Sequence, residues 1–491
     1  MNAPAPARGF LGHPRGMSVL FFTELWERFS YYGMRALLVL FLVDQVARGG
    51  LGLDDTTATA IYGLYTAGVY IMSLPGGWLA DRVFGAQSAV LWGGVLIGVG
   101  HLVLALADGL ASFCCGLAII VLGTGLLKPN IAALVAELYP EGGARRDAGF
   151  TLFYMAINVG AALGPLLTAW LAQRYGWHMG FLAAAVGMAA GVAWFLTARS
   201  ELGDVGGRPP RAIVNPLHRR IALGIAAVLV VLLALGFAGL LRFNAIVLQR
   251  GAIFVILALA LGFFVYLLGF AGLTASERRR TLVVLVLCVA STVFWAGFEQ
   301  AGSSLSLFAD RYTGRLIGSF EIPAGWFQSL NAVFIIVFAP LFSLLWIALA
   351  RAGHELSAPT KFVLGLLGMG TGFLAMAAAA RVVAGGALAA PTWLVLTYLL
   401  HTWGELALSP IGMSATSQLV PRRFIGQSMG IWYATLSLGN LLASRIAGEF
   451  DADHVDAMPG QYLGIFWYGA IAAVVLLALV PMTRRLSGKA S

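Results

Sequence analysis

Long apolar stretches alternate with short polar connections along the whole chain. Runs of about 18 or more predominantly apolar residues recur from one end to the other, and each is long enough to cross a hydrocarbon core of about 30 Å. This pattern predicts an all-α integral membrane protein with about fourteen spanning helices, an even number that places both termini on one side. The predicted spans are 17–45, 57–80, 86–107, 112–137, 147–173, 177–198, 218–241, 250–272, 281–308, 325–350, 360–380, 392–416, 424–449 and 461–483.

The distribution of basic residues predicts which side faces the cytoplasm. Lys and Arg number about 20 in the loops on the side of the termini and about 7 in the loops on the other side. Because basic loops are retained in the cytoplasm, we expect both termini to be cytoplasmic and the protein to lie in a bacterial inner membrane. The first span is full length and no cleavage site precedes it, so we expect it to be retained.

An internal repeat divides the chain. The run FYMAINVGAALG at Phe153–Gly164 resembles WYATLSLGNLLA at Trp432–Ala443. Because an even number of spans separates the two copies, they have parallel topology, as in the two halves of a major facilitator fold. We therefore expect a six-helix bundle over 1–198, a cytoplasmic linker with two additional helices over 199–280, and a second six-helix bundle over 281–491.

The loop between the second and third spans supports that fold. Its sequence, GGWLADRVFG at Gly76–Gly85, resembles the cytoplasmic loop motif of the major facilitator superfamily. Gly77 would let neighbouring helices approach, and Asp81 and Arg82 would cap or bridge helix ends at the membrane edge. An ordinary interfacial ion pair is the alternative interpretation.

Composition agrees with lipid as the surrounding solvent and excludes several functions. Hydrophobic residues make up 59% of the chain and charged residues 11%, whereas soluble domains are about a quarter charged. The net charge of +9 does not indicate nucleic acid, because the basic residues are spread over short loops. The three cysteines lie in apolar runs and form no disulfide or metal pattern. With neither an HExxH motif nor a Walker phosphate loop, we expect no metal, no other cofactor, no membrane-embedded enzyme and no ATP-driven pump.

The first span contains charges that a lipid-facing helix would not tolerate. It reads FFTELWERFSYYGMRALLVLF, and an ionisable residue in the middle of a span costs about 2.5–3.5 kcal/mol to insert. At the helical period, one stripe of this span carries Glu24, Glu27, Arg28, Tyr31 and Arg35. Such a face must meet water or partner groups, and a packing network that orients the helix is the alternative.

Other spans contribute ionisable residues of opposite sign in the two halves. Lys128 lies within the fourth span of a chain that has 28 arginines and only three lysines, which indicates a need for a compact cation. Glu299 and Glu405 lie in spans of the second half, the latter one turn from His401. Cations and acids facing one cavity would suit a zwitterion. Snorkelling is the alternative for Lys128, and helix packing is the more ordinary role for His401.

A series of motifs resembles proton-dependent oligopeptide transporters, the POT or PTR family of the major facilitator superfamily. The run ELWERFSYYG at Glu24–Gly33 resembles the family signature ExxERFxYYG. Matches continue in family order through both halves, and two extra helices between the halves are typical of bacterial members. The further motifs are GLLKPNI at Lys128, FYMAINVG at Asn158, FWAGFEQ at Glu299, FQSLN at Asn331, GELALSPIG at Glu405 and GIWYATLSLGN at Trp432.

The resemblance implies a role for each of these residues. It implies that the carboxylate of a peptide binds the cations Arg28, Arg35 and Lys128, and that its ammonium binds Glu405. Asn158 and Asn331 would bind the peptide bond. The implied pocket walls are Tyr31, Tyr70 and Trp432. Glu24, Glu27 and Glu299 are the candidate proton-coupling residues, because they are carboxyl groups within spans, and we hypothesise that Lys128 and Glu299 form a gating salt bridge.

The implied function is proton-coupled import of di- and tripeptides by alternating access. The expected partners are these peptides, peptide-like drugs, protons and membrane lipid, with no nucleic acid, and we expect a monomer. A transporter of nitrate or amino acids on the same scaffold is the nearest rival. The acid and the two amides favour a zwitterion over a small anion, and isolated charges of both signs favour a gated site over a passive channel.

Overall fold

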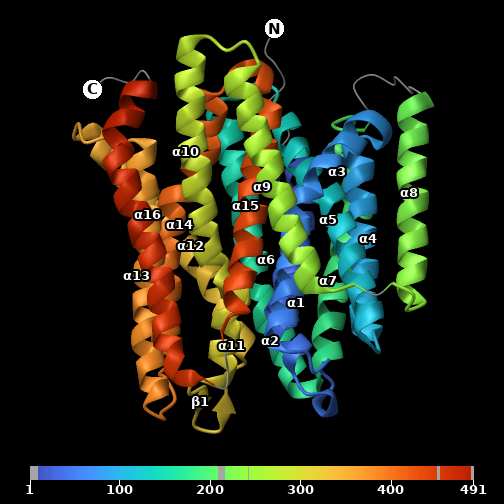
Figure 1. The fold of residues 1–491 in the computed structure, drawn as a ribbon. Coiled ribbons are helices and arrows are strands. Elements are labelled where there is room, and N and C mark those ends of the chain that lie inside the picture. Colours follow the sequence, from blue (N-terminus) through green and yellow to red (C-terminus); the bar gives the residue numbers. More distant parts are fainter. Residues whose placement is uncertain (1–8, 208–215, 242, 451–453, 488–491) are drawn as a thin grey trace. The chain divides into compact units, whose positions relative to one another are not determined.

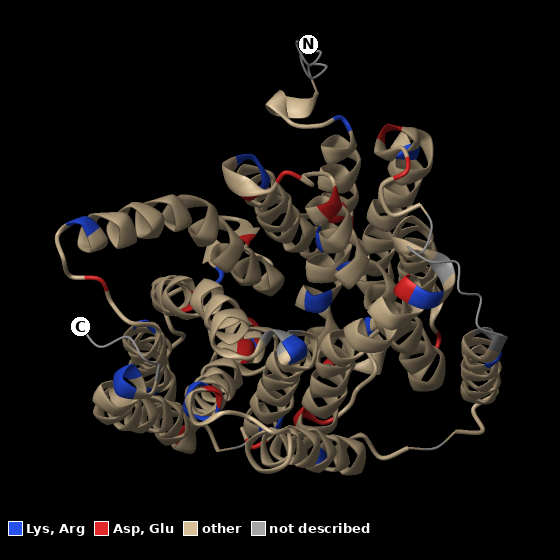
Figure 2. Ribbon diagram, turned by 90° about the horizontal axis from the view of Figure 1, so that it is seen from above, with Lys and Arg blue, Asp and Glu red and all other residues tan. Residues whose placement is uncertain are grey.

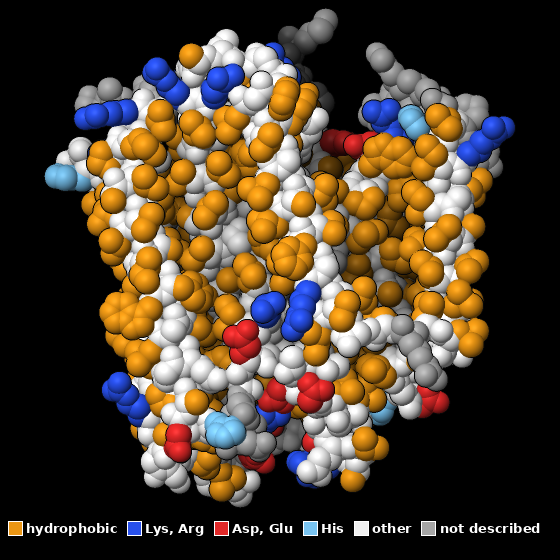
Figure 3. Space-filling view, viewed as in Figure 1, with side chains coloured by type: hydrophobic (Ala, Val, Ile, Leu, Met, Phe, Trp, Pro, Cys, Tyr) orange, Lys and Arg blue, Asp and Glu red, His pale blue; other side chains and the backbone are white. Residues whose placement is uncertain are grey.

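The computed structural model describes residues 9–207, 216–241, 243–450 and 454–487. Within these residues the chain is built from long helices and one short antiparallel hairpin, in which β1 (Leu316–Ile317) pairs with β2 (Phe320–Glu321) (Figure 1). Charged positions are few along the helices (Figure 2). Hydrophobic side chains cover most of the visible face between its two ends (Figure 3), as expected where lipid is the solvent.

The chain divides into two compact units. The first comprises Met1–Gly52 and Gly68–Phe243, and the second comprises Leu53–Ala67 and Asn244–Ser491. The helix α2 (Asp55–Ile71) therefore begins in the second unit and ends in the first.

The first unit follows the predicted spans closely. Its helices α6 and α7 are joined by the single residue Gly176, whose φ of 96° lies in the region that glycine favours. The elements of this unit are η1 (Phe10–Gly12), α1 (Gly16–Val43), η2 (Val46–Arg48), α3 (Ser73–Leu79), η3 (Ala80–Phe84), α4 (Ala86–Leu106), α5 (Leu110–Glu137), α6 (Gly143–Tyr175), α7 (Trp177–Ala198), η4 (Arg199–Leu202) and α8 (Pro216–Phe237).

The second unit contains the hairpin and the remaining helices. The first turn of α10 is fixed by a capping box, in which Thr274 and Glu277 each accept a hydrogen bond from the backbone of the other. The helical elements are α9 (Ala245–Gly269), α10 (Ala275–Phe298), η5 (Glu299–Gly302), α11 (Ser304–Arg311), η6 (Ala324–Gln328), α12 (Ser329–Arg351), α13 (Ala358–Ala384), α14 (Thr392–Leu419), η7 (Arg422–Phe424), α15 (Ile425–Ala447), η8 (Val455–Ala457) and α16 (Met458–Ser487).

Helix packing shows the repeat that the sequence predicts. In the first unit α1 packs on α6 and α7, and α4 packs on α5 and α7. In the second unit α10 packs on α15 and α16, and α13 packs on α14 and α16. The two matching runs lie on α6 and α15, which hold the same place in this scheme. Each unit is therefore one copy of a common helix arrangement, as the major facilitator fold requires.

Glycines set the close approach of α1 and α6. A Cβ atom at Gly160 or Gly164 would overlap a backbone carbonyl oxygen of α1, that of Leu25 or Phe29. Thr168 Oγ1 on α6 also donates a hydrogen bond to the carbonyl oxygen of Gly33 at 2.9 Å. The small residues let the two backbones touch, which holds the charged stripe of α1 in place.

Two predicted spans are not single helices. The span 57–80 divides into α2 and α3, and the span 281–308 divides at Glu299 into α10, η5 and α11. Both spans lie where the sequence predicts them, but the interruptions were not predicted, because apolar periodicity does not report a local change in backbone hydrogen bonding.

Four helices that carry candidate site residues are too polar or too short to qualify as membrane spans by composition. By length and hydropathy, ten helical stretches of the described chain qualify as membrane spans, and α1, α2, α14 and α15 are not among them. The charges of α1, the short length of α2 and the polar residues of α14 and α15 account for this. These four helices hold Glu24, Tyr70, Glu405 and Trp432.

The two additional helices pack on different units. Helix α8 contacts α5 and η3 of the first unit, whereas α9 contacts α15 and α10 of the second. Most of their side chains are exposed, as expected for helices at the lipid boundary. The domain limits expected at 198 and 280 stay a prediction.

Candidate functional site

In the first unit the charged stripe of α1 is buried. Glu24, Glu27 and Arg28 are exposed by 1%, 0% and 4%. Arg28 Nε donates a hydrogen bond to Glu24 Oε1 at 2.7 Å, and it lies 2.7 Å from Glu27 Oε2 in an ion pair that lacks hydrogen-bond alignment. One guanidinium therefore serves two carboxylates.

The two carboxyl groups are only partly satisfied within the described residues. Glu24 Oε2 and both oxygens of Glu27 are buried there without a hydrogen-bond donor. Lys128 lies close enough to act electrostatically on Glu27. Because buried charge is stable only when it is matched, the two carboxylates need a second positive charge beside Arg28, and Lys128 lies near enough to contribute it.

Each predicted cation of this unit has an aromatic ring beside it. Lys128 Nζ lies 4.1 Å from the ring centroid of Tyr70. Arg28 Cζ lies 5.7 Å from the ring of Tyr31, and Arg35 Cζ lies 5.8 Å from the ring of Tyr32. Cation–π contacts position these groups without neutralising their charge.

The predicted asparagine of the first unit lies on α6. Asn158 is buried, and its Nδ2 donates to the carbonyl oxygen of Tyr154 at 2.9 Å within the same helix. The amide is therefore held by its own helix, and it is not bonded through this donor to the charged residues of α1.

In the second unit two predicted residues meet directly. Asn331 Nδ2 on α12 donates to Glu405 Oε2 on α14 at 2.9 Å, and it lies 3.0 Å from Thr402 Oγ1. Both side chains are half-buried. The amide orients the carboxylate, and a hydrogen bond to a charged group is stronger than one between neutral groups.

Glu299 lies where the helix is interrupted. Helix α10 ends at Phe298, and Glu299 begins the 3₁₀ turn η5 in a buried position. The next residue fixes this turn, because Gln300 donates to the carbonyl oxygen of Ala443 at 3.0 Å and accepts from Ser304 Oγ at 2.6 Å. The break thus has a defined geometry.

Trp432 is a packing residue within its unit. Its side chain is 3% exposed, its ring lies 6.4 Å from that of Phe362, and a Cβ atom at Gly412 would overlap it. Its role as a wall of the substrate pocket stays a prediction.

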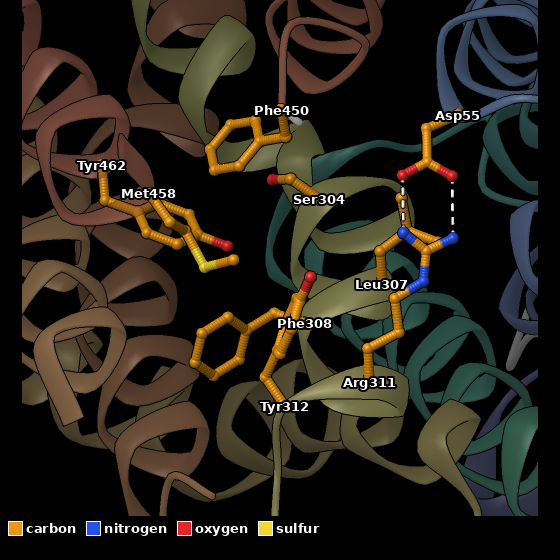
Figure 4. A pocket seen from close by; sticks show the side chains of 9 residues that line it. All are labelled: Asp55, Ser304, Leu307, Phe308, Arg311, Tyr312, Phe450, Met458 and Tyr462. Atoms are coloured by element: carbon orange, nitrogen blue, oxygen red, sulfur yellow. Dashed lines mark hydrogen bonds and ion pairs between the residues drawn. The ribbon is translucent and has the colours of Figure 1, made fainter. Parts of the chain in front are cut away.

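An ion pair that the sequence analysis did not single out joins α2 to α11. Arg311 donates two hydrogen bonds to the carboxylate of Asp55, at 2.6 and 2.7 Å, beside a cavity of about 20 Å³ that Ser304, Phe308 and Tyr462 help to line (Figure 4). The sequence did contain a signal for this pair: Asp55 and Arg311 have opposite charges and lie at span ends predicted on the same side of the membrane. Span counting could not pair them, because the residues are far apart in the chain.

Asp54 directly precedes Asp55 of that pair and lies before the predicted span 57–80. Thr57 N donates to Asp54 Oδ1 at 2.8 Å. Partial burial acts to raise the pKa of Asp54, but the hydrogen bonds from Thr57 and its neighbours prevail and lower the pKa below its ordinary value. The ionised carboxylate thus caps the start of α2.

Several known proteins are similar to this chain in sequence. Residues 87–462 match the family described as PTR2, the POT family. The chain is 43% identical to peptide transporter YePEPT of Yersinia enterocolitica subsp. palearctica, over 99% of this chain and 97% of that protein. It is 33% identical to a di-/tripeptide transporter of Lactococcus lactis subsp. cremoris, over 99% of each. The chain belongs to the POT family.

Solved structures of POT proteins have the same fold. A mutant of peptide transporter POT in complex with alafosfalin superposes with a TM-score of 0.90 at 40% identity, covering 98% of this chain and 97% of that one. A POT family transporter in complex with 5-aminolevulinic acid gives 0.86 at 33% identity, covering 97% and 98%. The predicted family and all-α fold are confirmed. The relatives are membrane transporters, so the chain is a multi-span peptide transporter of the POT family and not an enzyme.

The predicted loop motif of this POT chain, Gly76–Gly85, contains an exposed turn. Asp81 and Arg82 are both exposed in the π-helical turn η3. The close helix approach is made by Gly76, where a Cβ atom would overlap the carbonyl oxygen of Gly125. Gly77 has more room, since the nearest atom, Pro129 Cβ, would lie 3.9 Å away.

His401 is a packing residue in the second unit. His401 is buried, and its ring lies 4.9 Å from that of Phe373. Among the described residues, no group of three or more His, Cys, Asp or Glu side chains could hold a metal ion.

The structure thus assembles the site in two parts. The first unit brings together Glu24, Glu27 and Arg28. Nearby, Lys128 contacts the ring of Tyr70 and acts electrostatically on Glu27. The second unit brings together Asn331 and Glu405. That the cations of one unit and the acids of the other share one cavity stays a prediction.

Proposed function

We propose that this POT transporter imports di- and tripeptides together with protons by alternating access. The observation that carries the proposal is the division of charge. Buried or half-buried cations, each beside an aromatic ring, lie in the first unit, and an amide-oriented carboxylate lies in the second. Groups of opposite sign on two separately packed units suit a ligand with opposite charges at its two ends.

Each end of a peptide has a matching group in this scheme. The peptide carboxylate binds Arg28, Arg35 and Lys128, whose donors form strong charge-assisted hydrogen bonds. The ammonium binds Glu405, and the amides of Asn158 and Asn331 bind the peptide bond. Because such contacts recognise backbone, many side chains are accepted. The relatives named di-/tripeptide transporters support this substrate class.

Proton coupling follows from the surplus of buried carboxylate. Glu24 and Glu27 share Arg28, and three of their four oxygens lack a donor within the described residues. A proton on either carboxyl group supplies the missing donor and removes the surplus charge. Glu299, at the helix break, is the corresponding carboxyl of the second unit.

Exchange of partners then links the proton to movement. In this scheme Lys128 pairs with Glu299 in one state and interacts with Glu27 and Tyr70 in another. Docking of a substrate carboxylate on the cations, or protonation of a Glu, removes one of these pairings. The two units then rock about the site, as alternating access requires.

Uptake into liposomes tests the function as a whole. Purified protein in liposomes should accumulate a labelled dipeptide when an inward proton gradient is imposed, and a protonophore should abolish this accumulation. Accumulation that resists the protonophore would refute proton coupling. Strong uptake of 5-aminolevulinic acid with no uptake of dipeptide would favour a small non-peptide zwitterion, the ligand named for one relative.

The orientation is proposed from loop charge. Both termini face the cytoplasm, and the protein acts as a monomer in the bacterial inner membrane. A green fluorescent protein fused to the C-terminus should fluoresce, since that protein folds in the cytoplasm. An active alkaline phosphatase fusion at the same place would contradict this orientation.

A further inference from the structure

A second cavity of the second unit lies at the start of α9. Its volume is about 70 Å³, enough for several water-sized groups at about 10–15 Å³ each. Residues of α9, α15 and the first turn of α2 line it, including Arg250, Arg445 and Glu449. The cavity thus lies between α9, which is one of the two additional helices, and α15, which belongs to the repeated helix arrangement.

The cavity carries surplus positive charge. Both arginines are exposed, and Glu449 is the one carboxylate that lines the cavity among the described residues, with its Oε1 3.7 Å from Arg445 Nε. Two guanidinium groups beside one space repel each other unless an anion lies between them. A single exposed carboxylate compensates only one of them.

The walls of the cavity are fixed by hydrogen bonds. Gln249 is 3% exposed, and its Nε2 donates to Ser444 Oγ on α15 at 2.6 Å. On another side, Thr56 Oγ1 donates to the carbonyl oxygen of Gly448 at 2.8 Å. The backbone that carries each arginine is therefore held in position, and the cavity is a built feature of the unit.

The surroundings of the cavity are apolar and exposed. On α9 the residues on either side of Arg250, among them Val247, Leu248 and Phe254, are exposed hydrophobic side chains. In a membrane protein such side chains face acyl chains. An arginine at the end of such a helix lies at the boundary between acyl chains and headgroups, where anionic groups of lipids are found.

We propose that this cavity binds the phosphate of an anionic phospholipid, with Arg250 and Arg445 as its ligands. The guanidinium groups donate charge-assisted hydrogen bonds to the phosphate oxygens, and the exposed apolar face of α9 accommodates the acyl chains. With the proposed orientation, the start of α9 and the end of α15 lie in the periplasmic half of the membrane, so the lipid belongs to the outer leaflet. The bound lipid stabilises the attachment of α9 to α15.

Native mass spectrometry of the purified full-length chain tests this site. Phosphatidylglycerol should bind wild type more tightly than phosphatidylcholine. In the R250Q/R445Q variant the affinity for phosphatidylglycerol should fall by about 25-fold, since each basic residue near an anionic lipid contributes about fivefold. R381Q removes an exposed arginine elsewhere in the second unit and is the matched control, with unchanged affinity. Equal affinity of R250Q/R445Q and wild type would overturn the proposal.

Two further variants separate a lipid from other anions. E449Q removes the competing carboxylate, so it should bind phosphatidylglycerol more tightly than wild type. Inorganic phosphate should not displace the lipid, and displacement at equal concentration would show a free phosphate site instead. Asp451 and Asp453 follow in the sequence and lie outside the described residues. If they neutralised the arginines, D451N/D453N would gain lipid binding that wild type lacks, and the proposal would be wrong.

Discussion

At the scale of single residues, the main feature is buried charge that lacks a full set of partners. Arg28 is shared by Glu24 and Glu27, and its Nε–H is aligned with only the first of them. Asn331, in contrast, is aligned with Glu405. The first arrangement leaves three buried carboxyl oxygens without a donor within the described residues, and the second fixes the orientation of a carboxylate.

The proposed role of Glu299 gives one prediction. In E299Q the side chain keeps its size but can no longer ionise, so uphill accumulation of dipeptide under a proton gradient should be lost, while exchange of labelled for unlabelled peptide continues. Liposome accumulation and counterflow measure the two activities. E137Q changes an exposed glutamate at the end of α5 and should behave as wild type. Normal accumulation by E299Q would exclude this residue from coupling.

The proposed role of Glu405 can be tested with modified peptides. In E405Q a dipeptide with a free amino group should bind about 10- to 100-fold more weakly, because a hydrogen bond to a charged group contributes about 1.5–3 kcal/mol. An N-acetylated dipeptide, which has no ammonium, should lose nothing. Competition against labelled dipeptide uptake measures both, and E321Q in the β2 strand is a neutral control. Equal losses for both peptides would contradict an ammonium site.

At the scale of elements, helix contacts set by glycine and a helix break set by Gln300 place the candidate residues. The backbones of α1 and α6 touch at Gly160 and Gly164, which keeps the stripe of α1 away from lipid. The break between α10 and α11 gives Glu299 a backbone geometry that a continuous helix would not have. Both features are local, yet each decides where a charge lies.

The close contact at Gly160 predicts that adding one methyl group there destabilises the protein, whereas the same change at an uncrowded glycine does not. G160A should lower the stability of the protein by about 1–3 kcal/mol, because overpacking forces backbones apart. G224A on α8 makes the same change where no atom lies within 4 Å, so it should be neutral or slightly stabilising. Thermal unfolding in detergent compares the two variants. Equal melting temperatures would mean that α1 and α6 are less tightly packed than described.

At the scale of the whole molecule, the two units repeat one packing scheme and share one helix. The pairs α1–α6 and α10–α15 are equivalent, as are α4–α5 and α13–α14. Helix α2 starts in the second unit and ends in the first. The bidentate pair of Asp55 and Arg311 holds its first turn within the second unit.

Exchange of these charges tests this pair. The single variants D55R and R311D should lower both the melting temperature and the rate of dipeptide uptake, because each places like charges together. The double variant D55R/R311D should recover much of both losses, since the pair is restored with reversed sign. D310N removes the neighbouring exposed carboxylate and should change neither measurement. If the double variant were as impaired as the singles, the pair would have no coupled role.

Sequence by itself determined how many spans the chain has, nearly all of their limits, the repeat and the family. The physical reason is that crossing a bilayer requires about 20 apolar residues, so span limits and costly intramembrane charges such as Arg28 and Lys128 are visible along the chain. Tertiary structure decided which groups meet: Asn331 with Glu405, Asp55 with Arg311, and Gln249 with Ser444. Each of these pairs joins residues on different helices, and the sequence spacing between two such residues does not specify which helix faces pack together.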